Sequence, residues 1–378
     1  MKQTIIWERG GYTQIGNILS ARNIKKWMLV CGNSFSRLEM ASYFDEIDIP
    51  CVVFRDFEPN PQYVDIEKGV LLFQEEQCEA LVAVGGGSAM DVAKCIKLFS
   101  VFPVGTDCLS QSYGDNDLLL IAVPTTAGSG SESTRFTVFY TGGDKQSIAH
   151  ASILPDYAIL EPSVLRTLPL YQKKCTMLDA LCQGIESWWS VQSTGESKAL
   201  ARRAVEGVVQ NWRAYLFENT DEAMANIMRA SNDAGQAIHV TQTTAAHAMA
   251  YKLTTLYGAP HGFAVALCLP EIWRYMLAHP SECIDPRGEA YVAQIFSDIS
   301  KALGVSSAAE AIRLFDDMMG ELKLSVPDKS GDVDIPALAA AVNLPRLGNN
   351  PARLSEDALK YMYGNIIPKM FSGVAYEA

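Results

Sequence analysis

The first part of the chain alternates short, continuous apolar runs with longer stretches in which apolar residues recur at helical spacing. The apolar runs have the length and composition of buried strands, and they stand at 27–31, 51–54, 80–84, 118–123 and 157–160. Helical stretches lie between them, as at 63–77 and 89–99. Strands that are apolar throughout and alternate with helices predict a parallel sheet covered on both faces.

Beyond about residue 155 the pattern changes to helices alone. Apolar residues recur at spacings of three and four from residue 171 nearly to the end, most clearly at 197–217, 220–238, 291–303 and 308–322. A chain of 378 residues is long enough for two hydrophobic cores. We therefore predict an α/β N-terminal domain, Rossmann-like with a parallel sheet, over 1–162 and an all-α C-terminal domain over 163–378.

Charge and composition narrow the class of partner. The net charge of −12 disfavours nucleic acid and anionic membrane surfaces as partners. No apolar run is long enough to span a bilayer, and the first residues do not follow the pattern of a signal peptide. The nine cysteines are scattered without a CxxC pair, which favours reduced thiols. We expect a cytoplasmic protein that has neither nucleic acid nor membrane as a partner.

A glycine-rich turn follows the strand expected at 80–84 and opens a helix. It consists of Gly85, Gly86, Gly87 and Ser88, and Asp91 follows. Glycines let the backbone approach a pyrophosphate closely, and a new helix offers free N–H groups and its positive dipole end to that anion. A tight turn without a ligand is the alternative. The strand before the turn and the helix after it favour phosphate binding.

A run rich in hydroxyl groups, 124–132, follows the next expected strand and includes Thr125, Thr126 and Ser129. Such a loop at the carboxyl end of a parallel strand lies where ligands bind in open α/β sheets. Taken alone, the run favours a polar surface loop over a ligand site.

Two histidines in the helical part are candidate metal ligands. His247 and His261 stand fourteen residues apart, which would separate them by about 21 Å in one straight helix. They can share a metal only if the chain turns between them, and Gly-Ala-Pro at 258–260 supplies a break. A carboxylate must come from elsewhere, and Asp179, with Gln183 on the same face of its helix, is a candidate. A structural histidine without metal is the alternative.

Four motifs in this order resemble the iron-dependent (group III) alcohol dehydrogenase family, a relative of dehydroquinate synthase. They are GGGSAMDVAK at 85–94, PTTAGSGSE at 124–132, Asp179-Ala180-Leu181 followed by Glu186, and His247 with Pro260-His261-Gly262. The resemblance implies that family's fold, a homodimer and an NAD(P)-dependent alcohol dehydrogenase or aldehyde reductase. The enzyme would transfer a hydride between the nicotinamide and a small alcohol/aldehyde pair.

The same resemblance implies which residues bind the cofactors. Asp179, His247 and His261 would bind a divalent metal, Fe(II) or Zn(II), which acts as a Lewis acid on the substrate oxygen. The glycine motif would hold the pyrophosphate of the dinucleotide. Thr125, Thr126 and Ser129 would line its nicotinamide and ribose region.

This chain departs from the family at two positions of the metal motif. Gln183 stands where the family has a histidine ligand, and a glutamine oxygen is a weaker ligand for iron or zinc. Weaker metal binding, three protein ligands plus water, and a harder ion all remain open. Tyr251 replaces a histidine that is often credited with proton relay, and Lys252 replaces a proline. Tyr251 is therefore a candidate catalytic residue.

Two cations are candidates for binding an anionic substrate, Lys252 and Arg135. A lysine whose ammonium simply reaches solvent is the alternative. The segments 175–190 and 247–253 resemble the phosphonoacetaldehyde reductase branch of the family, which reduces phosphonoacetaldehyde to 2-hydroxyethylphosphonate. A phosphonate dianion would suit both cations.

The choice of nucleotide depends on the turn after the first strand. The family often has an acidic residue there, whereas this chain has Cys31-Gly32-Asn33-Ser34. The turn, with Gly32 and Asn33, favours NADPH and leaves NADH open. Three alternatives to the reductase remain: a general dehydrogenase of short alcohols or diols, a non-redox carbocyclic synthase, and a metal-free binding protein that Gln183 would explain.

Overall fold

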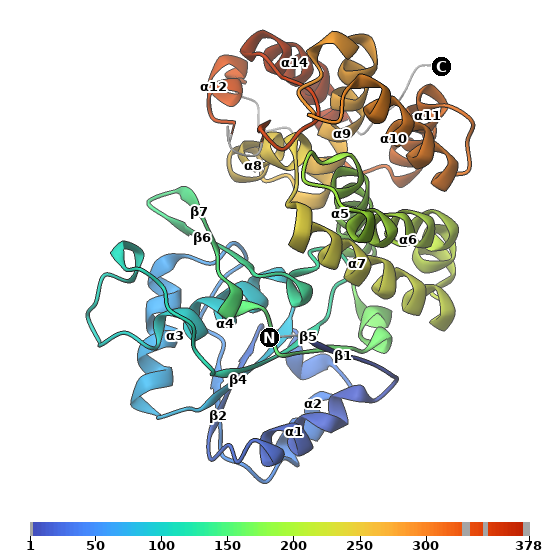
Figure 1. Ribbon diagram of the computed structural model, residues 1–378. Coiled ribbons are helices and arrows are strands. Elements are labelled where there is room, and N and C mark those ends of the chain that lie inside the picture. Colours follow the sequence, from blue (N-terminus) through green and yellow to red (C-terminus); the bar gives the residue numbers. More distant parts are fainter. Residues whose placement is uncertain (1–2, 327–332, 343–346, 373–378) are drawn as a thin grey trace. The chain divides into compact units, whose positions relative to one another are not determined.

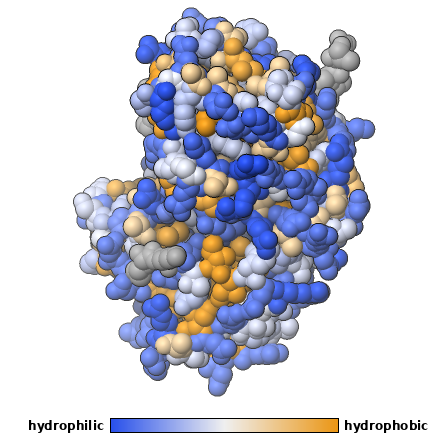
Figure 2. Space-filling model, turned by 45° about the vertical axis from the view of Figure 1, so that its right-hand side comes forward, coloured by the Kyte–Doolittle hydropathy of each residue, from blue (hydrophilic) through white to orange (hydrophobic). Residues whose placement is uncertain are grey.

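The computed structural model describes residues 3–326, 333–342 and 347–372 (Figure 1). The chain forms two compact units, Met1–Leu168 and Pro169–Ala378. The sequence pattern placed the domain limit after residue 162, and a 3-10 helix at Pro162–Thr167, with Val164 and Leu165 buried, still belongs to the first unit. Hydrophilic residues predominate on the face shown in Figure 2. None of the described helices combines the length and the hydropathy that a membrane span requires.

The first unit is built on a six-stranded parallel sheet. The strands run in the order β1 (Thr4–Trp7), β8 (Tyr157–Leu160), β5 (Leu119–Pro124), β4 (Ala80–Gly85), β2 (Trp27–Cys31) and β3 (Cys51–Phe54). Every pairing between neighbours is parallel. The predicted parallel sheet is therefore confirmed, and the strands at its centre are apolar because both of their faces are covered.

Helices cover both faces of this sheet. Figure 1 shows α1 (Ile15–Ala21) and α2 (Ala41–Asp45) on one side and α3 (Tyr63–Glu75) and α4 (Gly87–Phe99) on the other. The strand order explains this arrangement. The chain moves across the sheet in one direction from β1 to β3 and in the opposite direction from β3 to β5. Right-handed crossovers then place the two sets of helices on opposite faces.

One part of the first unit has no counterpart in the apolar runs of the sequence. The strands β6 (Phe136–Thr141) and β7 (Asp144–Ala149) form an antiparallel hairpin separate from the main sheet. Gly142 and Gly143 connect them with φ values of 58° and 86°. A two-residue turn of this kind needs positive φ at both positions, which glycine adopts without strain. The run FTVFYT of β6 is largely apolar, but residues of β7 are mostly polar and exposed, so the pattern did not reveal the second strand of the hairpin.

The second unit is helical, as predicted. Its helices are α5 (Leu170–Trp189), α6 (Gly195–Arg213), α7 (Asp221–Thr241), α8 (Ala245–Tyr257), α9 (His261–Ala278), α10 (Glu289–Ala302), α11 (Ala308–Leu322), α12 (Ile335–Ala340) and α14 (Glu356–Ser372). Helix α5 packs against α6, α7 and α9 and is buried on nearly every side from Met177 to Trp189. A helix that is buried all round forms the centre of a helical core.

Polar residues fix where several of these helices begin. Thr194 forms a capping box with Ser197 at the start of α6. Thr220 and Ser307 accept hydrogen bonds from N–H groups in the first turns of α7 and α11. Each hydroxyl satisfies a donor that the helix itself leaves without an acceptor, so the sequence specifies these boundaries locally.

Candidate functional site

One carboxylate and two imidazole rings converge inside the second unit. Ligand atoms of Asp179, His247 and His261 all lie within 4.8 Å of one another. Nε2 of His247 is 3.3 Å from Oδ1 of Asp179, and the centres of the two imidazole rings are 5.3 Å apart. This donor set suits Fe(II) or Zn(II), since both metals accept imidazole nitrogen and carboxylate oxygen. The cluster is the candidate metal site of this chain.

A break between two helices brings the two histidines together. Helix α8 ends at Tyr257, Gly258 follows with a φ of 72°, and α9 begins at His261. The turn predicted at 258–260 is therefore confirmed. His247 and His261 lie on different helices rather than four turns apart on one.

Gly262 allows α9 to lie directly against α5. A Cβ atom at this position would be 2.0 Å from the carbonyl oxygen of Cys175 and 2.8 Å from Cβ of Asp179. No real side chain tolerates such distances. The glycine after His261 is thus the reason why that histidine can approach Asp179.

A second carboxylate, Glu186, contacts His247 and the beginning of α8. Oε1 of Glu186 accepts hydrogen bonds from the backbone N–H of Thr244 (3.1 Å) and of Ala246 (3.0 Å) and from the hydroxyl of Thr244 (2.7 Å). Oε2 accepts a hydrogen bond from Nδ1 of His247. Glu186 therefore both stabilises the beginning of α8 and orients the His247 ring, as carboxylates commonly do for metal-binding histidines.

Sequence reasoning noted Glu186 only as part of the family motif and gave it no function. The available signal was a carboxylate two turns beyond Asp179 in an otherwise apolar stretch of α5. A buried charge in such a helix needs a partner. The sequence does not say that the partner is His247.

The pKa values in the cluster show that it favours positive charge. Burial alone would raise the pKa of Asp179, but the hydrogen bond from His247 and the charge of His261 lower it below its usual value. Burial likewise opposes ionisation of Glu186, and His247 outweighs it and lowers the pKa of Glu186. Burial would lower the pKa of His247, yet Glu186 and Asp179 raise it to about 9. Two ionised carboxylates thus surround the position that a metal cation would share.

Gln183 and Tyr251 lie beside the three clustered residues. Gln183 is buried one turn after Asp179, and its amide donates a hydrogen bond that helps to lower the pKa of the Asp179 carboxyl. Tyr251 lies one turn after His247, and its ring stacks on His261 with centres 6.1 Å apart and planes 14° apart. Both side chains contact residues of the cluster.

Lys252 is partly exposed and lies on another side of α8. Five residues separate it from His247, which corresponds to about 140° around the helix. Arg135 belongs to the first unit, is exposed, and carries its guanidinium 5.9 Å from the centre of the Phe136 ring. The predicted substrate cations are therefore on the surface of two different units.

The glycine-rich turn of the first unit has the features of an anion site. Helix α4 begins at Gly87 after Gly86, and no side chain caps its first N–H groups. A Cβ atom at Gly85 would be 2.6 Å from Cβ of Ala89, and one at Gly86 would be 3.3 Å from the Thr126 side chain. Only glycine leaves this narrow space open, and the uncapped N–H groups of α4, with Ser88 in the first turn, can bind a phosphate.

The hydroxyl-rich loop lies directly beside that turn. The backbone N–H of Thr125 donates to the carbonyl of Gly85 (2.9 Å), and a Cβ atom at Gly87 would be 3.4 Å from the side chain of Ser129. The two loops that sequence reasoning singled out separately are therefore adjacent. They follow the neighbouring strands β4 and β5 at the carboxyl edge of the sheet.

The buried Lys94 connects α4, the helix that follows the glycine-rich turn, with the hydroxyl-rich loop and the residues after it. Nζ of Lys94 donates to the hydroxyl groups of Ser131 (3.0 Å) and Thr134 (3.1 Å) and to the carbonyl of Phe136 (2.7 Å). The hydroxyl of Ser131 also donates to Asp91 (3.4 Å). Burial raises the pKa of Asp91 to about 6 and lowers that of Lys94 to about 8. In this structure the Asp91 carboxylate contacts the loop, whereas sequence reasoning assigned it to the cofactor.

The remaining predicted nucleotide residues, Gly32 and Asn33, form the turn after β2. No atom would lie within 4 Å of a Cβ atom at Gly32, so this turn is open.

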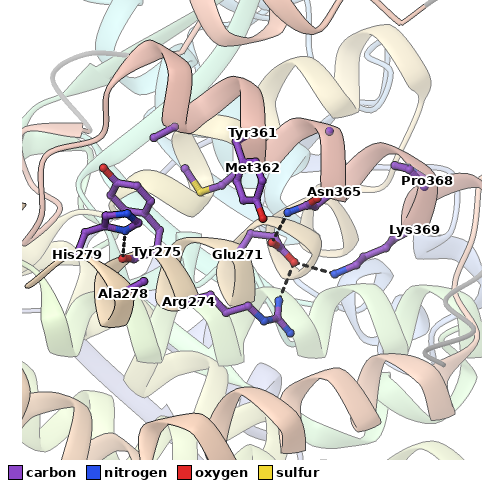
Figure 3. A pocket seen from close by; sticks show the side chains of 12 residues that line it. Glu271, Arg274, Tyr275, Ala278, His279, Tyr361, Met362, Asn365, Pro368 and Lys369 are labelled. Carbon is purple, nitrogen blue, oxygen red and sulfur yellow. Dashed lines mark hydrogen bonds and ion pairs between the residues drawn. The ribbon is translucent and has the colours of Figure 1, made fainter. Parts of the chain in front are cut away.

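A cavity of about 870 Å³ lies elsewhere in the second unit, between α9 and α14 (Figure 3). Its lining includes none of the clustered metal-ligand candidates. The buried carboxylate of Glu271 accepts hydrogen bonds from Arg274 (2.6 Å), Lys369 (2.7 Å) and Asn365 (3.2 Å). Glu271 follows His261 on α9 by ten residues, or about 15 Å of helix. The cavity is therefore distinct from the metal cluster.

Comparison with known proteins adds to this geometry. The model of the iron-containing alcohol dehydrogenase family matches residues 2–162, and that of the family's C-terminal domain matches residues 174–366. A phosphonoacetaldehyde reductase of Streptomyces viridochromogenes is 34% identical over 302 residues, which cover 76% of each chain. A 1,3-propanediol dehydrogenase of Klebsiella pneumoniae is 31% identical over 277 residues, 71% of this chain and 69% of that enzyme.

Solved structures resemble the chain over nearly its whole length. A sulfoacetaldehyde reductase of Bifidobacterium kashiwanohense in complex with NAD⁺ has a TM-score of 0.86 and 26% sequence identity, with 96% of each chain covered. A 1,3-propanediol oxidoreductase has a TM-score of 0.85 and 25% identity, with 96% of this chain and 97% of that one covered. These similarities confirm the predicted fold class.

Proposed function

We propose that this chain, which belongs to the iron-containing alcohol dehydrogenase family and is therefore an oxidoreductase of alcohols and aldehydes, reduces phosphonoacetaldehyde to 2-hydroxyethylphosphonate. The observation that carries the reduction is the convergence of Asp179, His247 and His261 within 4.8 Å. The choice of substrate is supported by two relatives. One is named for phosphonoacetaldehyde and the other for sulfoacetaldehyde, and both of these aldehydes carry an anionic group.

In this proposal Asp179, His247 and His261 hold an Fe(II) or Zn(II) ion. The pKa shifts of the cluster fit a cation, and its donor atoms are those that both metals accept. Gln183 would orient Asp179 through its hydrogen bond rather than act as a fourth ligand. When bound, the metal supplies Lewis-acid polarisation of the carbonyl group, and the reduced nicotinamide supplies the hydride.

The chain's own side chains would orient ligands and supply a proton. Glu186 accepts a hydrogen bond from Nδ1 of His247, so Nε2 is the ring nitrogen that faces the cluster and would bind the metal after losing its proton. Reduction of an aldehyde requires a hydride on the carbonyl carbon and a proton on its oxygen. We assign the transfer of that proton to the phenol of Tyr251, whose ring stacks on His261.

The nucleotide would bind to the two adjacent loops of the first unit. The first N–H groups of α4 would hold the pyrophosphate at Gly86, Gly87 and Ser88. Thr125, Thr126 and Ser129 would line the ribose and the nicotinamide. Asp91 and Lys94 would keep the second of these loops in place.

The phosphonate would be bound by Lys252 through charge-assisted hydrogen bonds. Activity with an aldehyde panel tests this choice, with phosphonoacetaldehyde, sulfoacetaldehyde and the neutral 3-hydroxypropanal each measured with both reduced nucleotides. We expect the highest kcat/KM for phosphonoacetaldehyde. Lys252→Ala should raise KM for the anionic aldehydes about tenfold and leave KM for the neutral one within about twofold. Lys301→Ala, which removes a lysine exposed elsewhere on the second unit, is the matched control.

A second candidate is a dehydrogenase of short diols. The similarity to a 1,3-propanediol dehydrogenase and to a 1,3-propanediol oxidoreductase favours it, as does the position of Lys252 away from the His247 side of α8. This candidate predicts that 3-hydroxypropanal is reduced best and that Lys252→Ala affects all three aldehydes equally. Such a result would replace phosphonoacetaldehyde as the substrate.

A further inference from the structure

The sheet of the first unit carries a second polar region next to the glycine-rich turn. Strand β4 lies between β5 and β2, and β3 lies beyond β2. All four strands are parallel, so their carboxyl ends meet at one edge of the sheet. At this edge Gly32, Asn33 and Ser34 follow β2, and Arg55 follows β3. The pairing of Val30 with Phe54 places Arg55 beside Cys31.

Arg55 is close to two residues at this edge. The positive charge of its guanidinium partly offsets the rise in the Cys31 thiol pKa that burial causes. The same guanidinium lies 5.9 Å from the centre of the Phe35 ring. Asp56, the next residue, pairs with Lys68 at 3.2 Å. Within the described parts of the chain, no carboxylate forms an ion pair with Arg55.

The turn after β2 offers donors and no negative charge. Asn33 and Ser34 carry side chains that can donate hydrogen bonds, and Gly32 has no side chain. The space around Gly32 is open, because no atom would lie within 4 Å of a Cβ atom there. An acidic side chain in such a turn would bind the ribose hydroxyls of NADH and repel a phosphate.

The strand order determines which half of a dinucleotide would meet this region. A pyrophosphate at the glycine-rich turn after β4 has the Thr125–Thr126 loop on its β5 side and the Gly32 turn on its β2 side. With the nicotinamide half on the β5 side, the adenosine half extends over β2 toward β3. Neighbouring strands are about 4.8 Å apart, so Arg55 lies about two strand spacings from the pyrophosphate turn, within reach of an adenosine ribose.

We infer that Arg55, together with Asn33 and Ser34, binds the 2′-phosphate of NADPH and makes NADPH the preferred nucleotide of this enzyme. The inference rests on the nucleotide site of the proposed function and adds the residue that distinguishes the two nucleotides. A guanidinium presents several N–H donors in one plane, and it binds phosphate oxygens in pairs. The position of the guanidinium over the Phe35 ring, at the end of β3, places its donors at the edge where an adenosine ribose would lie.

Nucleotide binding to the full-length protein, measured by calorimetry, tests the inference without any turnover. The probes are NADPH, NADH and the fragments 2′,5′-ADP and 5′-ADP. We expect NADPH to bind at least about tenfold more tightly than NADH. Arg55→Ala should weaken the binding of NADPH and of 2′,5′-ADP by about tenfold or more. The affinities for NADH and 5′-ADP should stay within about twofold of those of the unmodified protein. Arg55→Lys should retain part of the preference, because an ammonium keeps the charge and loses the paired geometry.

Two further variants sharpen the test. Gly32→Asp fits the open space without strain and places a carboxylate in the turn. It should therefore weaken the binding of NADPH and leave the binding of NADH unchanged. Arg22→Ala removes the same charge at the end of α1, just before β2 and hence at the opposite edge of the sheet, and should change neither affinity.

Equal loss of both nucleotides in Arg55→Ala, or tighter binding of NADH by the unmodified protein, would overturn the inference. Neither result would affect the assignment as an aldehyde reductase, which would then use NADH. Conversely, binding of nucleotide and fragments needs neither metal nor aldehyde, so an inactive aldehyde panel leaves this test valid.

Discussion

The fully buried carboxylate of Glu186 accepts a hydrogen bond from Nδ1 of His247. The other oxygen of Glu186 is held by backbone N–H groups and the Thr244 hydroxyl at the start of α8. The carboxylate has no proton to donate, so Nδ1 must carry a hydrogen, and Nε2 is the ring nitrogen left for a metal once its own proton is lost. Nε2 lies 3.3 Å from Oδ1 of Asp179, to which it donates while the ring, with its pKa raised to about 9, is protonated. A residue outside the metal cluster therefore sets the tautomer of a residue inside it.

Glu186→Gln should reverse this tautomer while preserving the helix start. The amide oxygen can still accept from α8, and the amide nitrogen then donates to Nδ1, which moves the ring hydrogen to Nε2. We expect metal affinity, measured by chelator competition, to fall about 10–100-fold. The ¹⁵N chemical shifts of His247 in metal-free protein above pH 9, where the ring is neutral, should report the changed tautomer.

A variant of Thr244 distinguishes the two functions of Glu186, which are to orient His247 and to cap the beginning of α8. Thr244→Val removes the hydroxyl that bonds Oε1 of Glu186 and leaves the contact with His247 intact. It should lower the melting temperature without changing the His247 tautomer. If Glu186→Gln lowers thermal stability alone and leaves the ¹⁵N shifts and the metal affinity unchanged, Glu186 is only a cap.

Gly262→Ala should disrupt the contact between α9 and α5. The added methyl group would overlap the carbonyl of Cys175 and approach Asp179, so the two helices must separate. We expect a loss of about 3 kcal/mol in the free energy of unfolding and weaker metal binding, because His261 begins the displaced helix.

Gly364→Ala is the matched control for that change. Gly364 is an exposed position within α14, and no atom lies within 4 Å of a Cβ atom built there. The substitution should stabilise the protein by up to about 1 kcal/mol, since alanine favours a helix over glycine. Denaturant unfolding of both variants checks the close approach of the helices at Gly262. Equal stability of the two variants would contradict it.

Lys94 should make stability rise with pH in the alkaline range. Burial lowers its pKa from 10.5 to about 8, so the folded protein binds fewer protons there than the unfolded chain between these values. The free energy of unfolding then increases with pH across this window, by about 1 kcal/mol per pH unit from this one group. The cost of burying the ammonium is fully present below pH 8 and disappears toward pH 10.5.

Comparison with Lys94→Met isolates this contribution from those of other groups. Urea unfolding at several pH values between 8 and 10.5 should show the parent protein gaining stability relative to the variant. Lys301→Met, which removes a lysine exposed on the second unit, is the control for the loss of one positive charge. A constant difference for Lys94→Met as well would show that Lys94 titrates normally.

Glu271 should contribute to stability and not to metal binding. Its carboxylate is buried and holds Arg274, Lys369 and Asn365 between α9 and α14 (Figure 3). Glu271→Ala leaves two cations without this partner. Since Arg274 is 37% exposed, solvent screens part of the loss, and we expect about 2 kcal/mol of destabilisation.

The control for Glu271 is a surface pair of the same type. Glu206→Ala breaks a contact with Arg202, which is 63% exposed, and should cost at most about 0.5 kcal/mol. Metal affinity should be unchanged in both variants, because Glu271 lies about 15 Å along α9 from His261. A loss of metal affinity in Glu271→Ala would connect the cavity to the cluster.

Local patterns in the sequence determined the elements of the fold. The central strands β2, β4 and β5 are covered on both faces, so each is apolar without interruption and stands out along the chain. The end of α8 was also specified locally, because Gly258 adopts a positive φ that few other residues accept. The hairpin β6–β7 was missed, because only its first strand is apolar and its second strand is mostly exposed and polar.

Only the tertiary structure decided which side chains share a site. Asp179 and His247 lie 68 residues apart, and no periodicity within one helix encodes a contact between two helices. The contact depends on close packing of α9 against α5 at Gly262. The bond from His247 to Glu186 and the position of Arg55 beside Cys31 have the same origin. A sequence specifies its helices and strands by local spacing, whereas the convergence of charges follows from how buried surfaces fit together.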